Sequence, residues 1–354
     1  MRKHLLGDLL QKNAFLKPLS ALLVLFMLSG CAAGPGVGAQ NLPVGVPVQV
    51  TPALAATSAP VAAATAPVAT EVSIYRVPPR SPDVTNILLL GTDSRSARGT
   101  TVGGNADTII LASFNRASNV VTLVSFMRDA VLPISGEYGK LKTAYRTGGP
   151  GLIINTLNEF FLLDIQGYVV IGLDGFASFV EQTLGGLDVT LDQSEIDDIN
   201  ARILNYQNEI DAVKNCPLVT SAPGLVHLNG VQTLLFVRNR TTPVHAAVGE
   251  ASDYDRADRQ QEVLALMFHK LVAQEPITAI PGLVSFALKH VETNLSAEAL
   301  YALAEPLMSE SVTMEGVSVP FEGMWEYGGD ASGILFDQTP TVRKLHARLY
   351  GWND

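Results

Sequence analysis

The chain has 354 residues, of which 47% are hydrophobic and only 16% are charged, and its formal net charge is −10. This composition is sufficient for a sizeable core, and the length allows one large domain or two small ones. The acidic balance argues against nucleic acid as a partner. Any polyanion that the chain binds must therefore meet a local cluster of arginines.

The first residues have the pattern of an export signal. Four basic residues among the first 17 precede an apolar run from Leu19 to Leu28, which is too short for a comfortable membrane span. The run ends in Leu28-Ser29-Gly30-Cys31, which resembles the lipobox of bacterial lipoproteins. We expect residues 1–30 to be removed as a lipoprotein signal peptide and Cys31 to be lipidated, which anchors the chain at the extracytoplasmic face of the membrane. An ordinary signal peptide or an uncleaved anchor is the alternative.

The segment after Cys31 is predicted to be a tether. Residues 31–70 contain no Asp, Glu, Lys or Arg and consist largely of Ala, Pro, Val, Thr and Gly. Such a composition cannot build a core, so we assign residues 31–81 to a disordered Ala/Pro-rich linker and residues 82–354 to the folded domain. The remaining cysteine, Cys216, is interpreted as an inert thiol.

Strands and helices alternate along the rest of the chain. Short apolar runs predict strands at residues 87–90, 108–114, 120–126, 168–171, 187–191 and 312–319. Apolar spacing of helical type, or in one case a polar and acidic stretch, predicts helices at residues 152–163, 176–184, 195–213, 229–238, 253–272, 297–308 and 341–349. This alternation predicts one α/β domain with helices on both faces of a central sheet.

Polar residues gather where the predicted strands begin or end. Asp93 follows the first strand, Asp107 precedes the second, and Arg128 follows the third. Strand ends in open α/β sheets are where ligands bind. Two carboxylates in such a place are plausible ligands for magnesium, which shares its oxygen ligands with substrate phosphates. For either aspartate taken alone, a turn or cap residue is the alternative.

Further arginines lie at predicted helix ends. Asp253, Arg256 and Gln260 are spaced i, i+3 and i+7, which puts them on one helical face, although a solvated helix start has the same pattern. Arg238 could also act as a helix cap. The guanidinium group matches phosphate bidentately, so a pyrophosphate cradle is the interpretation we favour for five residues: Arg95, Arg128, Arg238, Arg240 and Arg256.

Seven ordered blocks resemble the LytR-CpsA-Psr domain. They are NILLLGTDSR (86–95), ADTIILASFN (106–115), VTLVSFMRDA (121–130), KLKTAY with the following GG (140–149), IGLDGFASFVEQTLGGLDV (171–189), HLNGVQTLLFVRNR (227–240) and DYDRADRQQEVL (253–264). The resemblance covers roughly residues 84–275. It implies a three-layer α/β/α sandwich with a central mixed sheet, polyprenyl-pyrophosphate binding, magnesium dependence, and transfer of a glycan-phosphate from the lipid carrier to peptidoglycan at the outer face of the cell membrane.

The family's functional residues map onto matching positions. The resemblance assigns the metal-side carboxylates to Asp93 and Asp107, and adds to the five arginines Lys140, Asp253 and Gln260 on the pyrophosphate side. It makes Asp93, Asp107, Arg128, Arg238, Arg240 and Arg256 the catalytic set. Three features depart from the family pattern: Asn105 stands where an arginine is usual, residues 241–252 form an insertion, and a lipidated cysteine replaces a transmembrane helix.

Two other functions use the same residues. A non-catalytic lipoprotein could bind phosphorylated glycans or lipids in the cradle, and a pyrophosphatase would hydrolyse the lipid pyrophosphate without transfer. A solute-binding lipoprotein would normally show two lobes and no such arginine set. A lipid tail would need an apolar slot, and helices such as the one at 152–163, with Phe160 and Phe161, could line it, but plain core is the role we favour for any single one of these residues.

Overall fold

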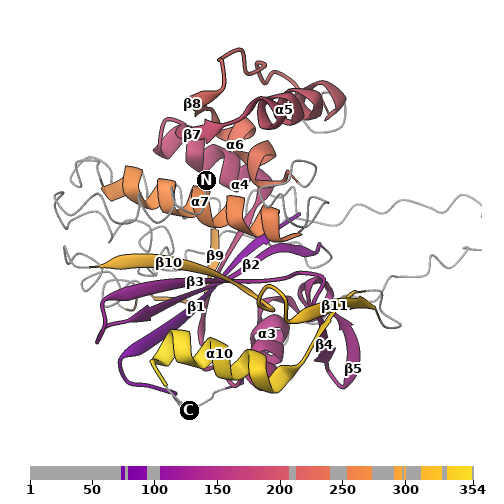
Figure 1. Ribbon diagram of the computed structural model, residues 1–354, viewed down its shortest axis with the longest axis vertical. Coiled ribbons are helices and arrows are strands. Elements are labelled where there is room, and N and C mark those ends of the chain that lie inside the picture. The colour runs from indigo at the N-terminus through magenta and orange to yellow at the C-terminus, as the bar shows by residue number, and fades with distance from the viewer. Residues whose placement is uncertain are drawn as a thin grey trace, which may run out of the picture.

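A six-stranded mixed sheet runs through the centre of the molecule (Figure 1). The computed structural model describes residues 73–75, 79–93, 104–206, 213–239, 253–272, 291–296, 299, 312–328 and 333–352. In spatial order, the strands of the sheet are β10 (Thr313–Val319), β3 (Val120–Phe126), β2 (Ala106–Asn115), β1 (Val84–Thr92), β6 (Gly167–Gly172) and β9 (Val291–Thr293).

Four of these strands point in one direction. β10 is parallel to β3 and β1 is parallel to β6, whereas β2 is antiparallel to both of its neighbours and β9 is antiparallel to β6. The carboxyl ends of β1, β3, β6 and β10 therefore lie at one end of the sheet, together with the start of β2. This is the end at which open α/β sheets bind ligands.

One face of the sheet, the α3–α10 face, is covered by α3 (Leu141–Phe161) and α10 (Gln338–Tyr350). Successive residues of a strand point to opposite faces, and Leu88 and Leu90 of β1 join the core on this side. The ring centroids of Phe126 and Phe161 lie 5.0 Å apart within it. α3 bends at residues 148 and 149, because Gly149 adopts a φ of 66° before the second helical segment begins.

The other face, the α7 face, is covered by α7 (Asp253–Val272). Leu264 and Phe268 of this helix pack on Ile110 and Leu123 of the sheet. Beyond α7, on the side away from the sheet, lies a further group of helices and strands (Figure 1), which encloses a second core. It is built from α4 (Leu173–Ser178), a π-helical turn η1 (Phe179–Thr183), β7 (Leu187–Leu191), α5 (Gln193–Tyr206), β8 (Gly224–Leu228) and α6 (Gly230–Val237).

Two hairpins complete the described fold. They are β4 (Val131–Ile134) with β5 (Glu137–Lys140), and β11 (Trp325–Gly328) with β12 (Gly333–Phe336). The backbone N–H of Ile334 donates a hydrogen bond to the carbonyl of Asp129 at 2.9 Å. This bond ties β12 to the segment that follows β3, so the β11–β12 hairpin lies beside β4.

Residues ahead of the predicted domain start also belong to the folded part. The N–H of Tyr75 donates to Asn155 Oδ1 at 2.9 Å, and Asn155 Nδ2 donates to the carbonyl of Ser73 at 2.9 Å. Ile74 packs against the core of the α3–α10 face. These contacts correct the predicted start at residue 82, because the buried amide of Asn155 obtains its partners from this segment. Residues 1–72, which include the predicted signal peptide and most of the predicted tether, lie outside the described residues.

The predicted α/β class, with a mixed sheet and helices on both faces, is confirmed. The strand predicted at 120–126 and the helix predicted at 253–272 match β3 and α7 residue for residue. The helix predicted at 176–184 is divided between α4 and the π-helical turn, and the one predicted at 297–308 lies outside the described residues. No helix in the described ranges is long and apolar enough to cross a membrane.

Candidate active site

A bulge at the end of the β1–β2 pair brings two predicted carboxylates together. Gly91 pairs with Thr108 and Thr92 pairs with Ala106, so Asp107 is an extra residue between these two pairs. The N–H of Asn105 donates to Asp93 Oδ1 at 2.8 Å, and the N–H of Asp93 donates to the carbonyl of Asn105 at 3.2 Å. Asp93 and Asp107 therefore lie on adjacent strand ends, where the sequence predicts the metal-side carboxylates.

Arg128 connects the carboxylates around this end of the sheet. Its Nη1 donates to Asp107 Oδ1, and its Nε lies 3.5 Å from Asp129 Oδ2 and 3.6 Å from Asp253 Oδ2. Burial acts to lower the pKa of Arg128, but the carboxylates of Asp253, Asp107 and Asp129 outweigh burial and raise it. The guanidinium is thus held as a cation that joins β2, the end of β3 and α7.

Asp129 lies among three cations. Lys142 Nζ is 2.7 Å and Lys140 Nζ is 3.7 Å from Asp129 Oδ1, and Arg128 adds a third positive charge. Burial acts to raise the pKa of Asp129, but the hydrogen bond from Lys142 and the charges of Arg128 and the two lysines lower it overall. Asp129 therefore stays ionised and is a weak base. Lys140, a predicted pyrophosphate ligand, belongs to this charged cluster.

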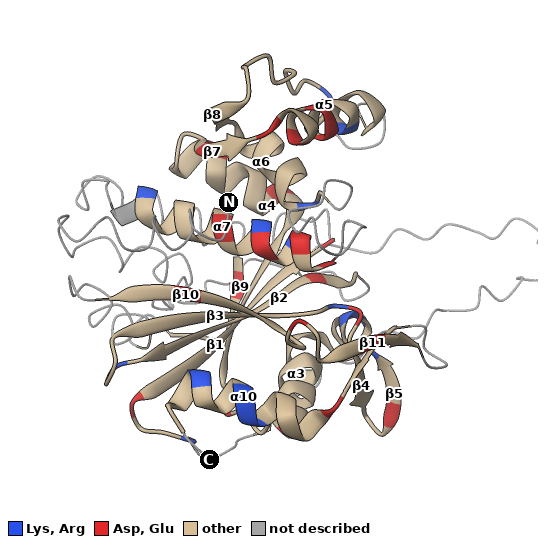
Figure 2. Ribbon diagram, in the orientation of Figure 1, with Lys and Arg blue, Asp and Glu red and all other residues tan. Residues whose placement is uncertain are grey.

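The start of α7 adds the remaining charges. Arg256 Nη2 lies 3.2 Å from Asp253 Oδ1, and Asp253 also faces Arg128. Figure 2 shows that most charged residues of α7 lie in its N-terminal half, next to the end of the sheet. The predicted common face of Asp253, Arg256 and Gln260 is consistent with this arrangement, because Arg256 and Gln260 line the same cavity.

That cavity lies between the sheet, α4, α6 and α7. Its volume is about 200 Å³, and it opens to solvent on one side. Most of its lining is apolar: Leu89, Leu90, Ile110, Val169, Ile171, Leu173, Phe176, Phe179, Leu234, Val237, Val263, Leu264, Met267 and Val291. The charged and amide-bearing lining residues are Asp107, Arg238, Arg256 and Gln260. They come from the start of β2, the end of α6 and the start of α7, so the polar groups meet the apolar walls beside the charged cluster.

α3, which was considered as a lining for a lipid tail, belongs to the packed core instead. Phe161 is only 1% exposed, and its ring lies 5.0 Å from Phe126 and 6.1 Å from Phe336. Phe160 packs against the same core. Both rings are on the α3–α10 face, whereas the apolar cavity is on the α7 face. The core alternative is therefore the correct one for this helix.

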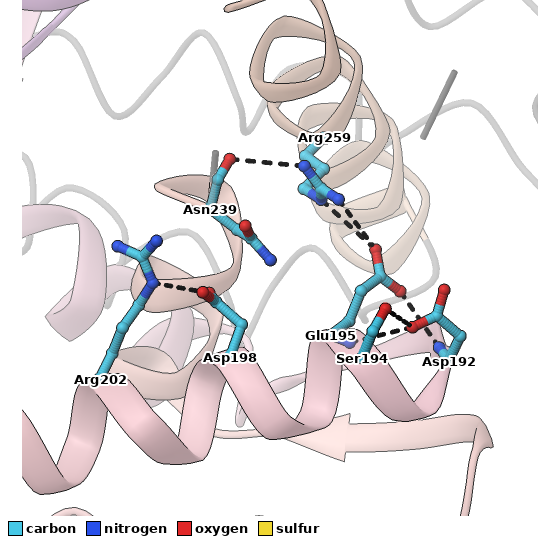
Figure 3. Close-up of polar contacts among 7 residues, drawn as sticks. All are labelled: Asp192, Ser194, Glu195, Asp198, Arg202, Asn239 and Arg259. Carbon is cyan, nitrogen blue, oxygen red and sulfur yellow. Dashed lines mark hydrogen bonds and ion pairs between the residues drawn. The ribbon is translucent and has the colours of Figure 1, made fainter. Parts of the chain in front are cut away.

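A buried ion pair supports the helices around the cavity (Figure 3). Arg259 and Glu195 are each 1% exposed, and Arg259 Nη2 lies 3.3 Å from Glu195 Oε1. Arg259 Nη1 also donates to the carbonyl of Asn239 at 3.4 Å. Asn239 directly follows Arg238, the cavity-lining arginine at the end of α6. The side chain of Arg259 therefore connects three elements, namely α7, α5 and the end of α6.

The donors at the β1–β2 end fit a hard divalent cation. Asp93 and Asp107 supply carboxylate oxygens, and among the described residues the buried Thr92 Oγ1 and Asn105 Oδ1 have no hydrogen-bond partner. The described part of the chain contains no group of three or more His, Cys, Asp or Glu that could hold a metal ion. A cation at this place would therefore complete its coordination with substrate phosphates and water, as magnesium often does.

The structure brings together eight of the predicted site residues: Asp93, Asp107, Arg128, Lys140, Arg238, Asp253, Arg256 and Gln260. Arg95, Arg240 and the predicted lipidation site Cys31 lie outside the described residues. The sequence interpretation missed Asp129, Lys142 and Arg259. Each of the three is adjacent or close in sequence to a predicted residue. Its contacts within the site depend on a hairpin or on the crossing of two helices, which local sequence patterns do not predict.

Comparison with known proteins decides the family. The sequence pattern described as the LytR_cpsA_psr family matches residues 51–348, which is most of the chain. The chain belongs to the LytR_cpsA_psr family. This confirms the resemblance that the seven sequence blocks indicate.

Individual relatives of this LytR_cpsA_psr protein are distant. Biofilm regulatory protein A of Streptococcus mutans is 28% identical over 219 residues, which cover 59% of this chain and 50% of that protein. The polyisoprenyl-teichoic acid–peptidoglycan teichoic acid transferase TagU of Bacillus mycoides is 25% identical over 261 residues, or 73% of this chain and 75% of TagU. The chain thus spans half the length of the first and three quarters of the second.

The fold is shared with solved structures. TagT of B. subtilis superimposes with a TM-score of 0.56 at 23% identity, covering 79% of this chain and 98% of TagT. Protein gbs0355 of Streptococcus agalactiae gives a TM-score of 0.60 at 22% identity, covering 76% of this chain and 87% of that protein. At these identities the similarity establishes the α/β architecture alone.

Proposed function

We propose that this chain transfers a glycan-phosphate from a polyprenyl-pyrophosphate carrier to peptidoglycan at the outer face of the cell membrane. The observation that carries the proposal is the junction of an apolar cavity with a charged cluster, because Asp107 and Arg256 belong to both. A polyprenyl pyrophosphate has the same two parts. The similarity to TagU, which is named as a transferase of teichoic acid from a polyisoprenyl carrier to peptidoglycan, supports the same reaction class.

The cavity would take the lipid tail. Its walls are aliphatic and aromatic side chains, and burying apolar surface contributes about 25 cal/mol per Å². Arg238 and Arg256 would bind pyrophosphate oxygens, since guanidinium groups pair bidentately with phosphate. Gln260, one turn further along α7 than Arg256, would donate from its side-chain amide.

Arg128 would stabilise negative charge during the transfer. It is fixed by Asp107, Asp253 and Asp129 before any substrate arrives, so its orientation needs no rearrangement at the moment of reaction. The attacking group would be a sugar hydroxyl of peptidoglycan. Asp129 is poorly suited to accept the proton of that hydroxyl because its pKa is lowered, and its role is to hold Arg128 and Lys142 in place.

Asp93 and Asp107 would hold magnesium against the pyrophosphate. The bound cation would neutralise charge on the reacting and leaving phosphate oxygens. Asp107 would then both coordinate the cation and pair with Arg128, so its replacement should remove two contacts at once. Lipidation of Cys31 would place this site near a membrane-bound substrate, and residues between Cys31 and the folded domain would supply the reach.

A two-product assay tests the proposal. The mature chain, a short glycan on a polyprenyl pyrophosphate, magnesium and a peptidoglycan fragment should yield polyprenyl phosphate and a glycan-phosphate attached to the fragment. Asp107→Asn and Asp93→Asn should each lower the rate by about 100-fold or more, because charge stabilisation of the transition state is lost. Asp188→Asn, at an exposed residue of β7 paired with His227, is the matched control and should leave the rate unchanged.

The other outcomes separate the rival functions. Lipid phosphate released without attachment to the fragment would indicate a pyrophosphatase. Lipid binding with no turnover in the wild type would indicate a non-catalytic binding protein. Full activity in the presence of a magnesium chelator would remove the cation from the mechanism.

A further inference from the structure

Three aromatic side chains form a continuous cluster at the start of α7. The ring of Tyr254 stacks on that of Trp325 with centroids 5.5 Å apart and an angle of 20° between planes. Trp325 in turn meets Tyr327 edge-on, with centroids 5.5 Å apart and an angle of 83°. The hydroxyl of Tyr254 donates to the carbonyl of Pro320 at 2.6 Å, which fixes the inner ring. The cluster therefore has a defined geometry.

The cluster is buried at its base and open at its outer end. Tyr254 and Trp325 pack against the small apolar group formed by Met127, Ala130, Ala257 and Ile334. Tyr327, by contrast, is 62% exposed. A single exposed aromatic side chain needs no functional explanation. An exposed ring supported by two further rings on a packed base is a different case, because it presents a rigid apolar surface to solvent.

Tyr327 lies next to the charged cluster. β11 pairs Tyr327 with Ile334, whose N–H donates to the carbonyl of Asp129. Burial raises the pKa of Tyr327, the carboxylates of Asp253 and Asp129 raise it further, and Arg128 acts in the opposite sense. The hydroxyl therefore lies within the electrostatic field of the site.

These contacts define an order of surfaces. The apolar cavity comes first, and Asp107 and Arg256 stand among its lining residues. Arg128 joins Asp107 to Asp253 and Asp129. Tyr327 follows on β11, and strand β12 lies between it and Asp129. A lipid-linked sugar has a matching order, namely an apolar tail, a pyrophosphate and a sugar ring.

We propose that Tyr327 and Trp325 form a carbohydrate subsite that holds the sugar joined directly to the pyrophosphate of the lipid carrier. One face of a pyranose ring carries C–H groups with partial positive charge, and these pack on the electron-rich face of an aromatic ring. The neighbouring carboxylate of Asp129 and ammonium groups of Lys140 and Lys142 offer acceptors and donors for sugar hydroxyls. The inference rests on the proposed function and adds to it a residue that selects the glycan.

Binding of two lipids to the mature chain tests the subsite. The probes are a long-chain polyprenyl pyrophosphate without sugar and the same lipid carrying one N-acetylhexosamine. Tyr327→Ala should weaken binding of the sugar-bearing lipid by about tenfold and leave binding of the bare lipid unchanged. Tyr327→Phe keeps the ring and should bind both lipids like the wild type. The control is Tyr138→Ala on β5, an exposed tyrosine separated from Tyr327 by β12 and β4, and it should change neither affinity.

The outcomes distinguish failure of the carbohydrate subsite from failure of the proposed transferase function. If the wild type binds both lipids and Tyr327→Ala lowers both affinities equally, or neither, the carbohydrate subsite is wrong while the proposed function stands. If the wild type binds neither lipid, the proposed function fails and the subsite fails with it. Because Tyr327 is exposed, its replacement should not unfold the chain, and an unchanged melting temperature verifies this in the same samples.

Discussion

The two faces of the central sheet are built from similar residues but are closed in different ways. On the α3–α10 face, Phe126, Phe161 and Phe336 fill the space between sheet and helices. On the α7 face, largely apolar side chains surround a cavity of about 200 Å³ that opens to solvent. Apolar composition alone therefore does not determine whether a face becomes a packed core or a binding cavity.

The difference lies in what holds the covering helices in place. α3 and α10 are held by a filled apolar core, in which interiors reach the density of organic crystals, and by a few buried hydrogen bonds such as that between His346 and the carbonyl of Phe161. α7, α5 and α6 also share apolar contacts, but here a buried ion pair is added, because Arg259 joins Glu195 and the carbonyl of Asn239 (Figure 3). A polar clamp of this kind fixes helix positions without filling the space beneath them. We infer that the cavity can stay open because the clamp replaces part of the apolar packing.

The largest expected effect comes from breaking this clamp. Arg259→Met should lower the free energy of unfolding by about 3–5 kcal/mol, because it leaves the buried carboxylate of Glu195 without its charge partner. Arg202→Ala removes the less buried i,i+4 ion pair with Asp198 on α5, the helix that also carries Glu195. This change should lower the free energy of unfolding by only about 0.5 kcal/mol. Chemical denaturation of both variants measures the contrast.

A double variant shows whether the loss of stability comes from an unpaired buried charge or from lost packing. In Arg259→Met with Glu195→Leu, both charges of the pair are removed together, so neither is left buried without its partner and stability should return close to that of the wild type. Equal losses in Arg259→Met and Arg202→Ala would contradict the special role of the buried pair. A double variant as unstable as Arg259→Met alone would show that the lost stability is not due to an unpaired charge.

A smaller effect should follow from adding volume to each face. Ile153→Phe on α3 enlarges a fully buried side chain in the filled core and should destabilise the chain by about 1–3 kcal/mol. Val263 on α7 is also buried but lines the cavity, so the larger ring of Val263→Phe has space beside it and should cost less, about 1 kcal/mol. The same change should weaken binding of a polyprenyl pyrophosphate by about tenfold or more, because the new ring occupies the space of the tail.

The comparison would fail in two ways. A large loss of stability in Val263→Phe would show that the α7 face is as tightly filled as the α3–α10 face. Unchanged lipid affinity in a stable Val263→Phe variant would place the lipid tail elsewhere. Thermal unfolding and lipid binding, measured on the same samples, distinguish these results.

The sequence was sufficient for most strands of the sheet and for part of the charged cluster. Asp93, Asp107 and Arg128 stand at the ends of strongly apolar strands, and the structure brings these ends together because β2 runs between two strands of opposite direction. The i, i+3, i+7 spacing at the start of α7 was equally informative, since helical geometry alone puts Arg256 beside Asp253.

Long-range packing was beyond the reach of sequence patterns. Nothing local distinguishes Phe161, which fills a core, from Phe179, which lines a cavity, because both follow apolar helical segments. The β11–β12 hairpin was missed because its strands have only four residues each, and with it Tyr327 and Trp325. Ser73, Ile74 and Tyr75 were assigned to the tether because a run of three residues shows no periodicity, although they contact the α3–α10 side of the fold.

The smallest expected effect is a pH dependence of stability, with one histidine on each face. Burial lowers the pKa of His269 on α7. Burial also lowers the pKa of His346 on α10, although the hydrogen bond to the carbonyl of Phe161, at 2.8 Å, and the charge of Asp164 act against this. For both residues the unfolded chain binds a proton more readily than the folded chain. Stability should therefore be unaffected well above pH 6.5, the ordinary value, and should decrease as the pH falls below it through the lowered folded pKa.

Replacing each histidine in turn assigns this dependence to a face. His269→Gln and His346→Gln remove one titrating group each, so each variant should lose less stability than the wild type when the pH is lowered from about 7.5 to about 5.5. Asp129 cannot account for a change in this range, because its pKa lies below the ordinary value of 3.8. His269→Gln should flatten the curve more than His346→Gln. Burial lowers the pKa of His269, whereas the carbonyl of Phe161 and the charge of Asp164 favour the protonated form of His346 and so oppose the shift of its pKa. Urea denaturation at a series of pH values measures both slopes, and a wild-type curve that is flat between these pH values would contradict the assignment for both faces.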